Sequence, residues 1–309
     1  MLDKHIFCRD ISRQSGEQLI GTVGTRRAWL LLQDHSAWAI QAYAGCDLPA
    51  AVRQHLEPFF GREKPSILLI RNSDEKHLPS RKAFVVVSRN TRAELYEFVW
   101  HQPEDLMTLP YAGILDGSYQ GDRAEPIYLV CTHGKRDKCC AKYGKPVYDY
   151  LRTRIGERVW RASHVGGDRF AANLVCLPHS LYYGRVTPEQ ALELVRKYEQ
   201  GELDLEAVRG RSCYPKLTQA AEIFVRRHFD IRVIDQMRFV SHEPLEGARH
   251  RLIFADLLEG RQLGVDIEVS QSEFANFLTC RDDEKESVPL YHSLRFTETA
   301  TESAHVLST

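Results

Sequence analysis

The stretch between residues 127 and 198 constrains the fold of this chain most strongly, because strand and helix patterns alternate there at close spacing. An apolar, β-rich run at 127–130 predicts a strand, and apolar residues at helical spacing within 145–154 predict a helix. A second β-rich run follows at 159–162. Two strands joined by a helix run parallel in one sheet, so their carboxyl ends meet at the same edge.

Two further runs complete this unit. The segments 173–177 and 181–186 flank a short turn and predict an antiparallel pair of strands. Thr187, Pro188 and Gln190 then predict the start of a helix, with a capping threonine, a proline in the first turn and a glutamine that reaches back. The sequence therefore predicts the order β-α-β-β-β-α.

Four candidate metal ligands follow the two parallel strands. Cys131 and Cys140 lie in the first loop with eight residues between them, and His164 and Asp168 lie in the second with three between. Because both loops leave the same edge of the predicted sheet, we expect these four side chains to form one site.

These residue types point to iron and sulfur chemistry. A [2Fe-2S] cluster needs four protein ligands, and thiolates and imidazoles are the groups that iron takes in such clusters. Two loops that offer two ligands each meet this count. No C-x-x-C motif occurs in the chain, so it lacks the dithiol typical of disulfide oxidoreductases.

Two motifs resemble known iron-sulfur proteins. The hairpin PHSLYYG at 178–184 and the helix start TPE at 187–189 resemble the P-x-x-x-W-Y-G hairpin and T-P-E helix of thioredoxin-like [2Fe-2S] ferredoxins. The motif C-x-H-G-x-R-D-x-x-C at 131–140, followed by H-x-G-G at 164–167, is similar to that of the sucrase/ferredoxin-like family. Fungal members of that family are cytosolic or mitochondrial [2Fe-2S] proteins with two cysteine and two histidine ligands.

The resemblance implies a [2Fe-2S] cluster held by Cys131, Cys140 and His164. The fourth ligand of the family falls on Asp168, where the fungal members have histidine. The residues also leave other candidates open for this fourth place, and these are Cys139, His133, Cys176 and His179.

The region before this unit predicts a second lobe of mixed structure. Three β-rich runs at 66–71, 82–88 and 94–100 and a helical pattern at 48–56 indicate an N-terminal α/β lobe over 1–124. We interpret Cys8 and Cys46 as isolated small side chains without chemistry.

The region after the unit predicts a third part. A helix over 217–228 and three alternating β-rich runs predict a C-terminal αβββ lobe over 205–280, in which Cys213 and Cys280 stand alone. The polar, Ser/Thr-rich segment 281–309 predicts a mobile tail. The fold class is thus α/β with α+β flanks around a thioredoxin-like ferredoxin domain at 125–204.

Composition and charge exclude several classes of function for this chain. A net charge of −1 argues against nucleic-acid binding, which needs a basic excess. No apolar run reaches the length of a membrane span. Eight cysteines in a chain without a signal-peptide pattern indicate the reducing cytoplasm. The basic residues Lys135, Arg136 and Lys138 predict a docking face for an acidic redox partner; the oligomeric state has no sequence signal.

These observations favour an electron-transfer protein, a one-electron carrier rather than an enzyme with its own substrate. Two alternatives stay open at this point. The first is a cluster-free thiol redox enzyme that uses Cys139 and Cys140, and the second is a structural zinc protein built on the same ligands.

Overall fold

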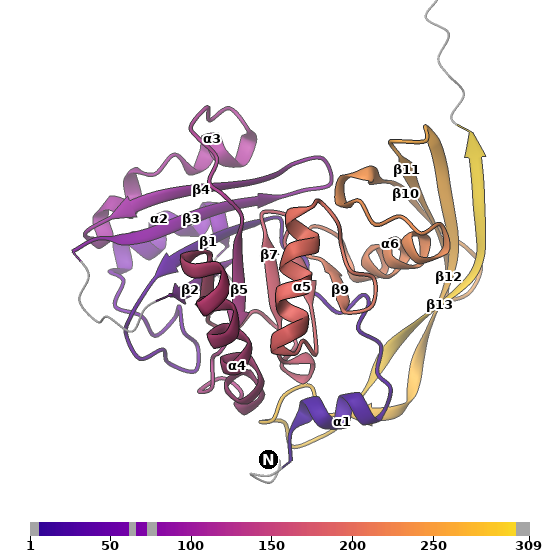
Figure 1. Ribbon diagram of the computed structural model, residues 1–309, viewed down its shortest axis with the longest axis horizontal. Coiled ribbons are helices and arrows are strands. Elements are labelled where there is room, and N and C mark those ends of the chain that lie inside the picture. Colours follow the sequence, from indigo (N-terminus) through magenta and orange to yellow (C-terminus); the bar gives the residue numbers. More distant parts are fainter. Residues whose placement is uncertain (1–5, 62–65, 73–78, 301–309) are drawn as a thin grey trace, which may run out of the picture.

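The computed structural model describes residues 6–61, 66–72 and 79–300, which form two β-sheets with helices packed against them (Figure 1). The first sheet is mixed and has nine strands in the order β4-β3-β1-β2-β6-β5-β7-β8-β9, and the second is antiparallel in the order β10-β11-β12-β13. The α/β class predicted from the sequence is therefore confirmed.

The strands of the first sheet are β1 (Ala28–Gln33), β2 (Ile67–Arg71), β3 (Arg81–Ser88), β4 (Ala93–Trp100), β5 (Ile127–Cys131), β6 (Val159–Ala162), β7 (Leu174–Leu177), β8 (Leu181–Tyr183) and β9 (Val208–Arg211). Those of the second are β10 (Met237–Pro244), β11 (Arg249–Asp256), β12 (Arg261–Asn276) and β13 (Glu286–Ala300). The α-helices are α1 (Cys8–Gln14), α2 (Ala50–Phe60), α3 (Tyr111–Asp116), α4 (Lys138–Ile155), α5 (Pro188–Glu199) and α6 (Lys216–His228).

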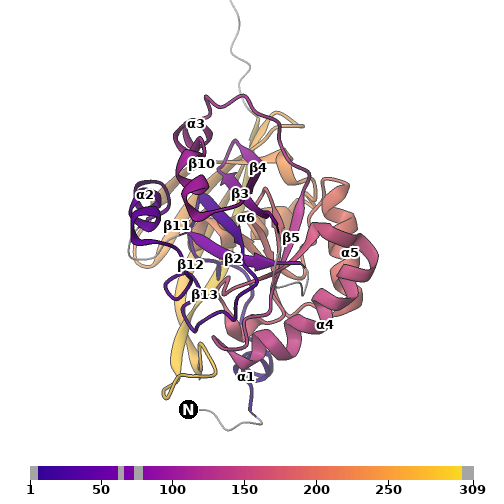
Figure 2. The ribbon, with the colours of Figure 1, turned by 90° about the vertical axis from the view of Figure 1, so that its left-hand side faces the viewer.

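The central unit has the predicted order, β5-α4-β6-β7-β8-α5. Strands β5 and β6 are parallel, with Cys131 opposite Ala162, and β7 pairs with β5 in the antiparallel direction. Helices α4 and α5 lie side by side (Figures 1 and 2). The predicted cap of α5 is also present, because the Thr187 hydroxyl accepts the Gln190 N–H at 3.3 Å and the Gln190 side chain accepts the Thr187 N–H at 3.1 Å.

Helix α4 begins seven residues earlier than the helical spacing indicated, at Lys138. Its N-cap is Asp137, whose carboxylate accepts the backbone N–H of Cys139 at 2.7 Å. Cys139 and Cys140 therefore lie in the first turn of a helix and not in an extended loop. Successive helical residues point about 100° apart, so the two thiols face different surroundings.

The nine-stranded sheet continues across the predicted boundary at residue 124. Strand β2 of the N-terminal part pairs with β6 of the central unit, with Ile70 opposite Ala162 and Arg71 opposite Arg161. The sheet also crosses residue 204, because β9 pairs with β8. The interiors on both faces are apolar: Tyr128 and Val130 point towards α4 and α5, and Leu129 points to the other face with Trp160.

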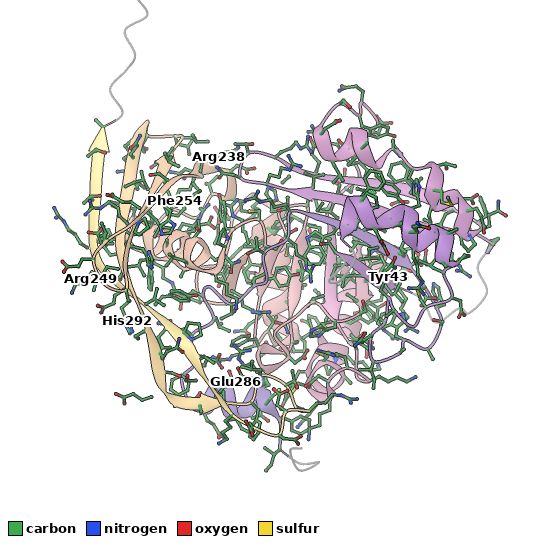
Figure 3. All side chains as sticks on the ribbon, turned by 180° about the vertical axis from the view of Figure 1, so that it is seen from behind. Tyr43, Arg238, Arg249, Phe254, Glu286 and His292 are labelled. Carbon is green, nitrogen blue, oxygen red and sulfur yellow. The ribbon has the colours of Figure 1, made fainter. Side chains whose placement is uncertain are left out.

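The C-terminal part differs from the αβββ prediction, because four strands follow α6. Residues 286–300, predicted as part of a mobile tail, form β13, which pairs with β12 over most of its length. As an edge strand β13 buries few side chains, so its composition stays polar like that of a tail. Residues 301–309 lie outside the described part. Phe254 points to the inner side of this sheet and Arg249 to the outer side (Figure 3).

None of the helices in the described ranges is long and apolar enough to cross a membrane.

A buried ion network anchors α6 between the two sheets. The Glu222 carboxylate, 1% exposed, accepts hydrogen bonds from Arg211 at 2.6 Å and from Arg226 at 3.0 Å. Arg226 also donates to the carbonyl oxygens of Val233 and Ile234, both at 2.8 Å, and so fixes the segment that leads into β10. The network thus links β9, α6 and the second sheet.

We expect Glu222→Gln to lower the free energy of unfolding by about 3–5 kcal/mol, because it leaves two buried guanidinium groups without a counter-charge. Burial alone would raise the pKa of Glu222, but Arg211 and Arg226 outweigh it and lower that pKa. The stabilisation is therefore present above the unfolded pKa of about 4.3 and is lost as the pH falls below it. Urea unfolding at pH 7 and at pH 3 measures this, with the exposed Glu193→Gln as control. Equal stability of parent and Glu222→Gln at pH 7 would contradict it.

Candidate metal centre

The two predicted ligand loops leave the same edge of the first sheet. Strand β5 ends at Cys131, and its parallel neighbour β6 ends at Ala162, two residues before His164. The second loop turns sharply at Gly166 and Gly167, whose φ angles of 93° and 79° suit glycine, and then enters the short 3₁₀ helix η3 (Asp168–Phe170). The turn brings Asp168 back towards the start of α4.

The structure brings all four predicted residues together. One carboxylate oxygen of Asp168, Oδ1, lies 3.1 Å from Cys140 Sγ and 3.0 Å from His164 Nδ1. Cys131 Sγ lies 3.6 Å from the carbonyl oxygen of Ser163 and is in hydrogen-bonding contact with Cys140. Cys131, Cys140 and Asp168 are buried, whereas the His164 side chain is 32% exposed.

The charges of these groups are interdependent. The hydrogen bond from Cys140, with His164 nearby, lowers the pKa of Cys131, whereas Cys131 and burial raise the pKa of Cys140. Burial would lower the pKa of His164, but Asp168 outweighs it and raises that pKa. Burial would likewise raise the pKa of Asp168, yet His164 and Cys140 lower it. The site therefore gathers two thiols and a carboxylate around one imidazole, and these donor atoms are suited to a cation.

Two orphaned polar groups test whether the site fits a metal cofactor. Asp168 Oδ2 is buried and has no hydrogen-bond partner among the described residues. His133, 3% exposed, has no side-chain hydrogen-bond partner within the described ranges; burial lowers its pKa to about 4, although a contact with the Ala39 backbone opposes this shift. Buried polar atoms without partners are rare, and at a metal site they are the atoms that the ion satisfies. The donor set and these free atoms fit an iron-sulfur cluster.

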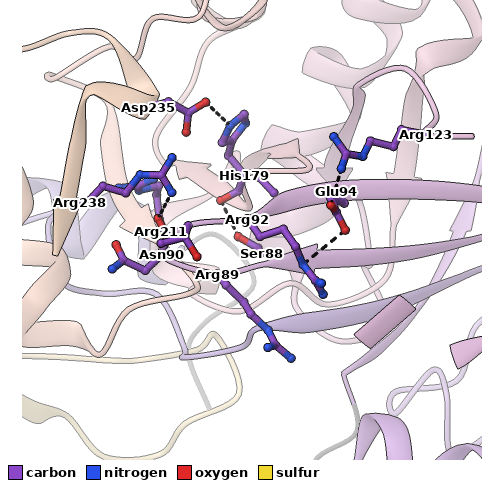
Figure 4. A pocket seen from close by; sticks show the side chains of 12 residues that line it. Ser88, Arg89, Asn90, Arg92, Glu94, Arg123, His179, Arg211, Asp235 and Arg238 are labelled. Carbon is purple, nitrogen blue, oxygen red and sulfur yellow. Dashed lines mark hydrogen bonds and ion pairs between the residues drawn. The ribbon is translucent and has the colours of Figure 1, made fainter. Parts of the chain in front are cut away.

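The other candidates for the fourth ligand differ in where they lie relative to the four-residue site. His133 is near the site, because the charges of His164 and Asp168 affect its pKa. Cys176 lies in β7 and packs in the apolar core. His179 lies in a separate pocket between the two sheets, where Nδ1 is 2.7 Å from the Tyr198 hydroxyl and Nε2 is 3.4 Å from Asp235 (Figure 4). Cys139 contacts other cysteines.

Arg209 holds the second loop, although the short basic run Arg209-Gly210-Arg211 gives no sequence signal of this role. Its buried guanidinium donates to the carbonyl of Gly166 at 3.0 Å and to the Asn173 side chain at 2.7 Å. The Asn173 amide in turn donates to the Gly167 carbonyl at 2.9 Å. Arg209 and Asn173 thus fix the turn between His164 and Asp168.

Helix α4 approaches the end of β5 closely at Gly144. A Cβ atom added to Gly144 would overlap the carbonyl oxygen of Cys131, which is backbone and cannot move alone. We expect Gly144→Ala to push α4 from β5, to destabilise the fold by about 1–3 kcal/mol and to reduce bound metal. Thermal unfolding and metal analysis measure this. The control is Gly24→Ala, whose added Cβ meets no described heavy atom within 4 Å; equal effects of both changes would exclude this role.

The structure also corrects the interpretation of two other cysteines. Cys8 and Cys280, predicted to be isolated, lie against Cys139 and Asp137 in a second buried group. Neither has a local sequence signal, because Cys8 lies in α1 and Cys280 lies in the turn between β12 and β13. Only the tertiary fold brings these residues together.

Known proteins are similar to parts of the chain. The altered inheritance of mitochondria protein 32 of Debaryomyces hansenii is 32% identical over 84 residues, which cover 24% of this chain and 31% of that protein. Its counterpart from Meyerozyma guilliermondii is 31% identical over 100 residues, covering 29% and 36%. The matched part is thus about a third of each yeast protein. Two cysteine-to-serine variants of the thioredoxin-like [2Fe-2S] ferredoxin from Aquifex aeolicus match 28% of this chain and 100% of theirs at 18% identity, with TM-scores of 0.25 and 0.26.

The family signature extends over most of the chain. The model of the Sucrase/ferredoxin-like family matches residues 19–210, a range that contains both ligand loops, Arg209 and all of the nine-stranded sheet except the last residue of β9. The protein therefore belongs to the sucrase/ferredoxin-like family.

Proposed function

We propose that this protein is a one-electron carrier that binds a [2Fe-2S] cluster through Cys131, Cys140, His164 and Asp168. The observation that carries the proposal is the convergence of two thiols, an imidazole and a carboxylate at one sheet edge, with Asp168 Oδ2 buried and unpaired in the described structure. When bound, such a cluster accepts and returns one electron.

The residues of the chain hold and orient the ligand atoms. Gly144 allows α4 to approach β5, which sets Cys140 beside Cys131, and Arg209 fixes the turn that sets His164 beside Asp168. The thiols give up their protons when metal binds, so metal affinity should rise with pH. Burial of both cysteines keeps water from the sulfur atoms.

The exposed side of the site is the place where we expect electrons to enter and leave. A cavity of about 660 Å³ opens beside His164 and is lined also by Arg136, Trp29, Tyr43 and Tyr182. Because His164 alone of the four ligands is partly exposed, it offers the shortest route to a partner.

The first ligand loop supplies the basic docking face in this proposal. Lys135 is exposed, and Arg136 and Lys138 are half-buried. Arg281 donates to the backbone carbonyl oxygens of Lys135 and Arg136, which holds the loop in place. This arrangement supports docking of an acidic redox protein, whose association would weaken as salt increases.

The geometry favours this carrier over a thiol enzyme built on Cys139 and Cys140. Cys140 Sγ contacts Asp168 at 3.1 Å, whereas Cys139 Sγ contacts Cys8 at 3.5 Å and Cys280 at 3.3 Å. The two thiols therefore do not act as a pair. All eight cysteines are free, in keeping with the proposed location in the cytoplasm.

Iron and sulfide analysis of anaerobically purified protein tests the proposal. We expect about two irons and two acid-labile sulfides per chain, with a paramagnetic signal that appears on one-electron reduction. A chain that stays free of iron and colourless after reconstitution with iron and sulfide would overturn the proposal.

A further inference from the structure

We propose that Cys8, Cys139 and Cys280, together with Asp137, form a second metal site that binds a single Zn²⁺ ion. We call these four residues the three-thiol group. Cys8 and Cys280 lie outside the range 19–210 matched by the family model, so the group is not part of the shared family core. It also uses none of the residues proposed to hold the iron-sulfur cluster.

The sulfur atoms of the three-thiol group form a nearly equilateral triangle. Cys8 Sγ lies 3.5 Å from Cys139 Sγ, Cys139 Sγ lies 3.3 Å from Cys280 Sγ, and Cys280 Sγ lies 3.4 Å from Cys8 Sγ. One ligand atom from each of the four residues lies within 4.8 Å of all the others. Four ligand atoms that lie so close together can bind one ion.

The triangle matches a single tetrahedral ion. Zinc binds thiolate sulfur at about 2.3 Å, so two sulfur ligands of one tetrahedral zinc lie about 3.8 Å apart. The observed sulfur distances need to grow by only a few tenths of an ångström.

Asp137 closes the fourth position. Its Oδ1 accepts the backbone N–H of Cys139 at 2.7 Å, and its Oδ2 accepts the backbone N–H of Cys280 at 2.6 Å. Each carboxylate oxygen has a second lone pair, so Asp137 can orient two of the cysteines and still coordinate the ion. The backbone N–H of Cys8 donates to Cys280 Sγ at 3.3 Å, a further hydrogen bond of the kind that stabilises metal thiolates.

Burial and ligand type indicate zinc in a structural role. Cys8 and Cys139 are 0% exposed, Asp137 1% and Cys280 5%, so no coordination position is open to substrate or bulk water. Closed sites with three or four thiolates are typical of structural zinc, whereas catalytic zinc keeps an open position. The surrounding side chains include Ala171, Phe7 and Phe277, which exclude water from the sulfur atoms.

Such an ion would join three distant segments. Figure 1 shows α1 and the turn between β12 and β13 beside the first turn of α4. In the first turn of α4, Cys139 is followed by Cys140, whose side chain faces the proposed iron-sulfur site. Zinc at the three-thiol group would therefore fix α1 and the turn between β12 and β13 against the helix that supplies a cluster ligand.

Zinc analysis and X-ray absorption of the wild-type protein test this proposal without any substitution. The protein is produced with both iron and zinc in the medium and purified without chelators. We expect one zinc per chain, surrounded by three sulfur atoms at about 2.3 Å and one oxygen at about 2.0–2.2 Å. No bound zinc, another metal in its place, or fewer than three sulfur neighbours would overturn the assignment.

Two variants then assign the site. We expect Cys8→Ser and Cys280→Ser each to weaken zinc binding about tenfold or more while the iron content stays that of the parent. Cys46→Ser and Cys213→Ser, which change cysteines outside the group, serve as matched controls and should keep both metals. Zinc that persists in Cys8→Ser and Cys280→Ser, or that leaves the controls equally, would show that it binds elsewhere.

Discussion

Cys140→Ser should lower the iron content of the protein by about tenfold or more, whereas Cys139→Ser should leave most of the iron bound. The two residues are adjacent in the first turn of α4, so both changes meet the same helix and the same N-cap. Their side chains differ in direction: Cys140 Sγ faces Asp168, and Cys139 Sγ faces Cys8 and Cys280. Iron and sulfide analysis with visible spectroscopy measures the difference.

Cys139→Ser serves as the control for Cys140→Ser, because it makes the same change in the same helical turn beside the site. Cys131→Ser should behave like Cys140→Ser, and Cys176→Ser, a change in the apolar core, should keep its iron. If Cys139→Ser and Cys140→Ser lost iron equally while both remained folded, the assignment of Cys140 as ligand would be wrong.

Much of the central unit could be predicted because its signals are local. The apolar runs of β5 and β6, the cap of α5 at Thr187 and the two ligand loops each occupy a few consecutive residues. Parallel strands carry their following loops to one edge as a matter of topology. The meeting of His164 and Asp168 with the first loop therefore followed from the order of elements alone.

The three-thiol group could not be predicted because it depends on contacts that span the chain. Cys8 and Cys280 are 272 residues apart, and neither belongs to a short motif. One partial signal was present: Asp137, two residues before Cys139, is a good N-cap, and recognising it would have placed both cysteines on a helix with different directions. Residues 286–300 resemble a tail for another reason, since an edge strand that buries few side chains has a polar composition.

The loop supports were also beyond sequence analysis. Arg209 sits in a short basic run that is typical of a solvated segment, yet burial lowers its pKa to about 10 and its guanidinium is fully used by the His164 loop and by Thr22. A buried arginine with backbone partners has no one-dimensional signature. Its role follows only from the position of β9 beside β8 in the sheet.

Asp168→His should raise the reduction potential of the cluster by on the order of 100 mV, because a neutral imidazole replaces an anionic carboxylate beside the iron. Removing negative charge favours the reduced state, which carries one more electron. The position of Asp168 supports direct ligation: Oδ1 lies 3.0 Å from His164 Nδ1 and 3.1 Å from Cys140 Sγ, and Oδ2 is buried without a partner in the described residues. Spectroscopically monitored redox titration measures the potential.

Asp168→Ala and Asp168→Asn separate ligation from a supporting hydrogen bond. If Asp168 binds iron, Asp168→Ala should lose iron or recruit the buried His133, and its visible spectrum should change. If Asp168 only orients His164, Asp168→Asn should keep the contact with His164. Neither Asp168→Ala nor Asp168→Asn should then change the visible absorption bands that depend on the iron ligands. An unchanged spectrum and potential in both Asp168→Ala and Asp168→His would therefore remove Asp168 from the ligand set and leave His133 as a candidate for the fourth ligand.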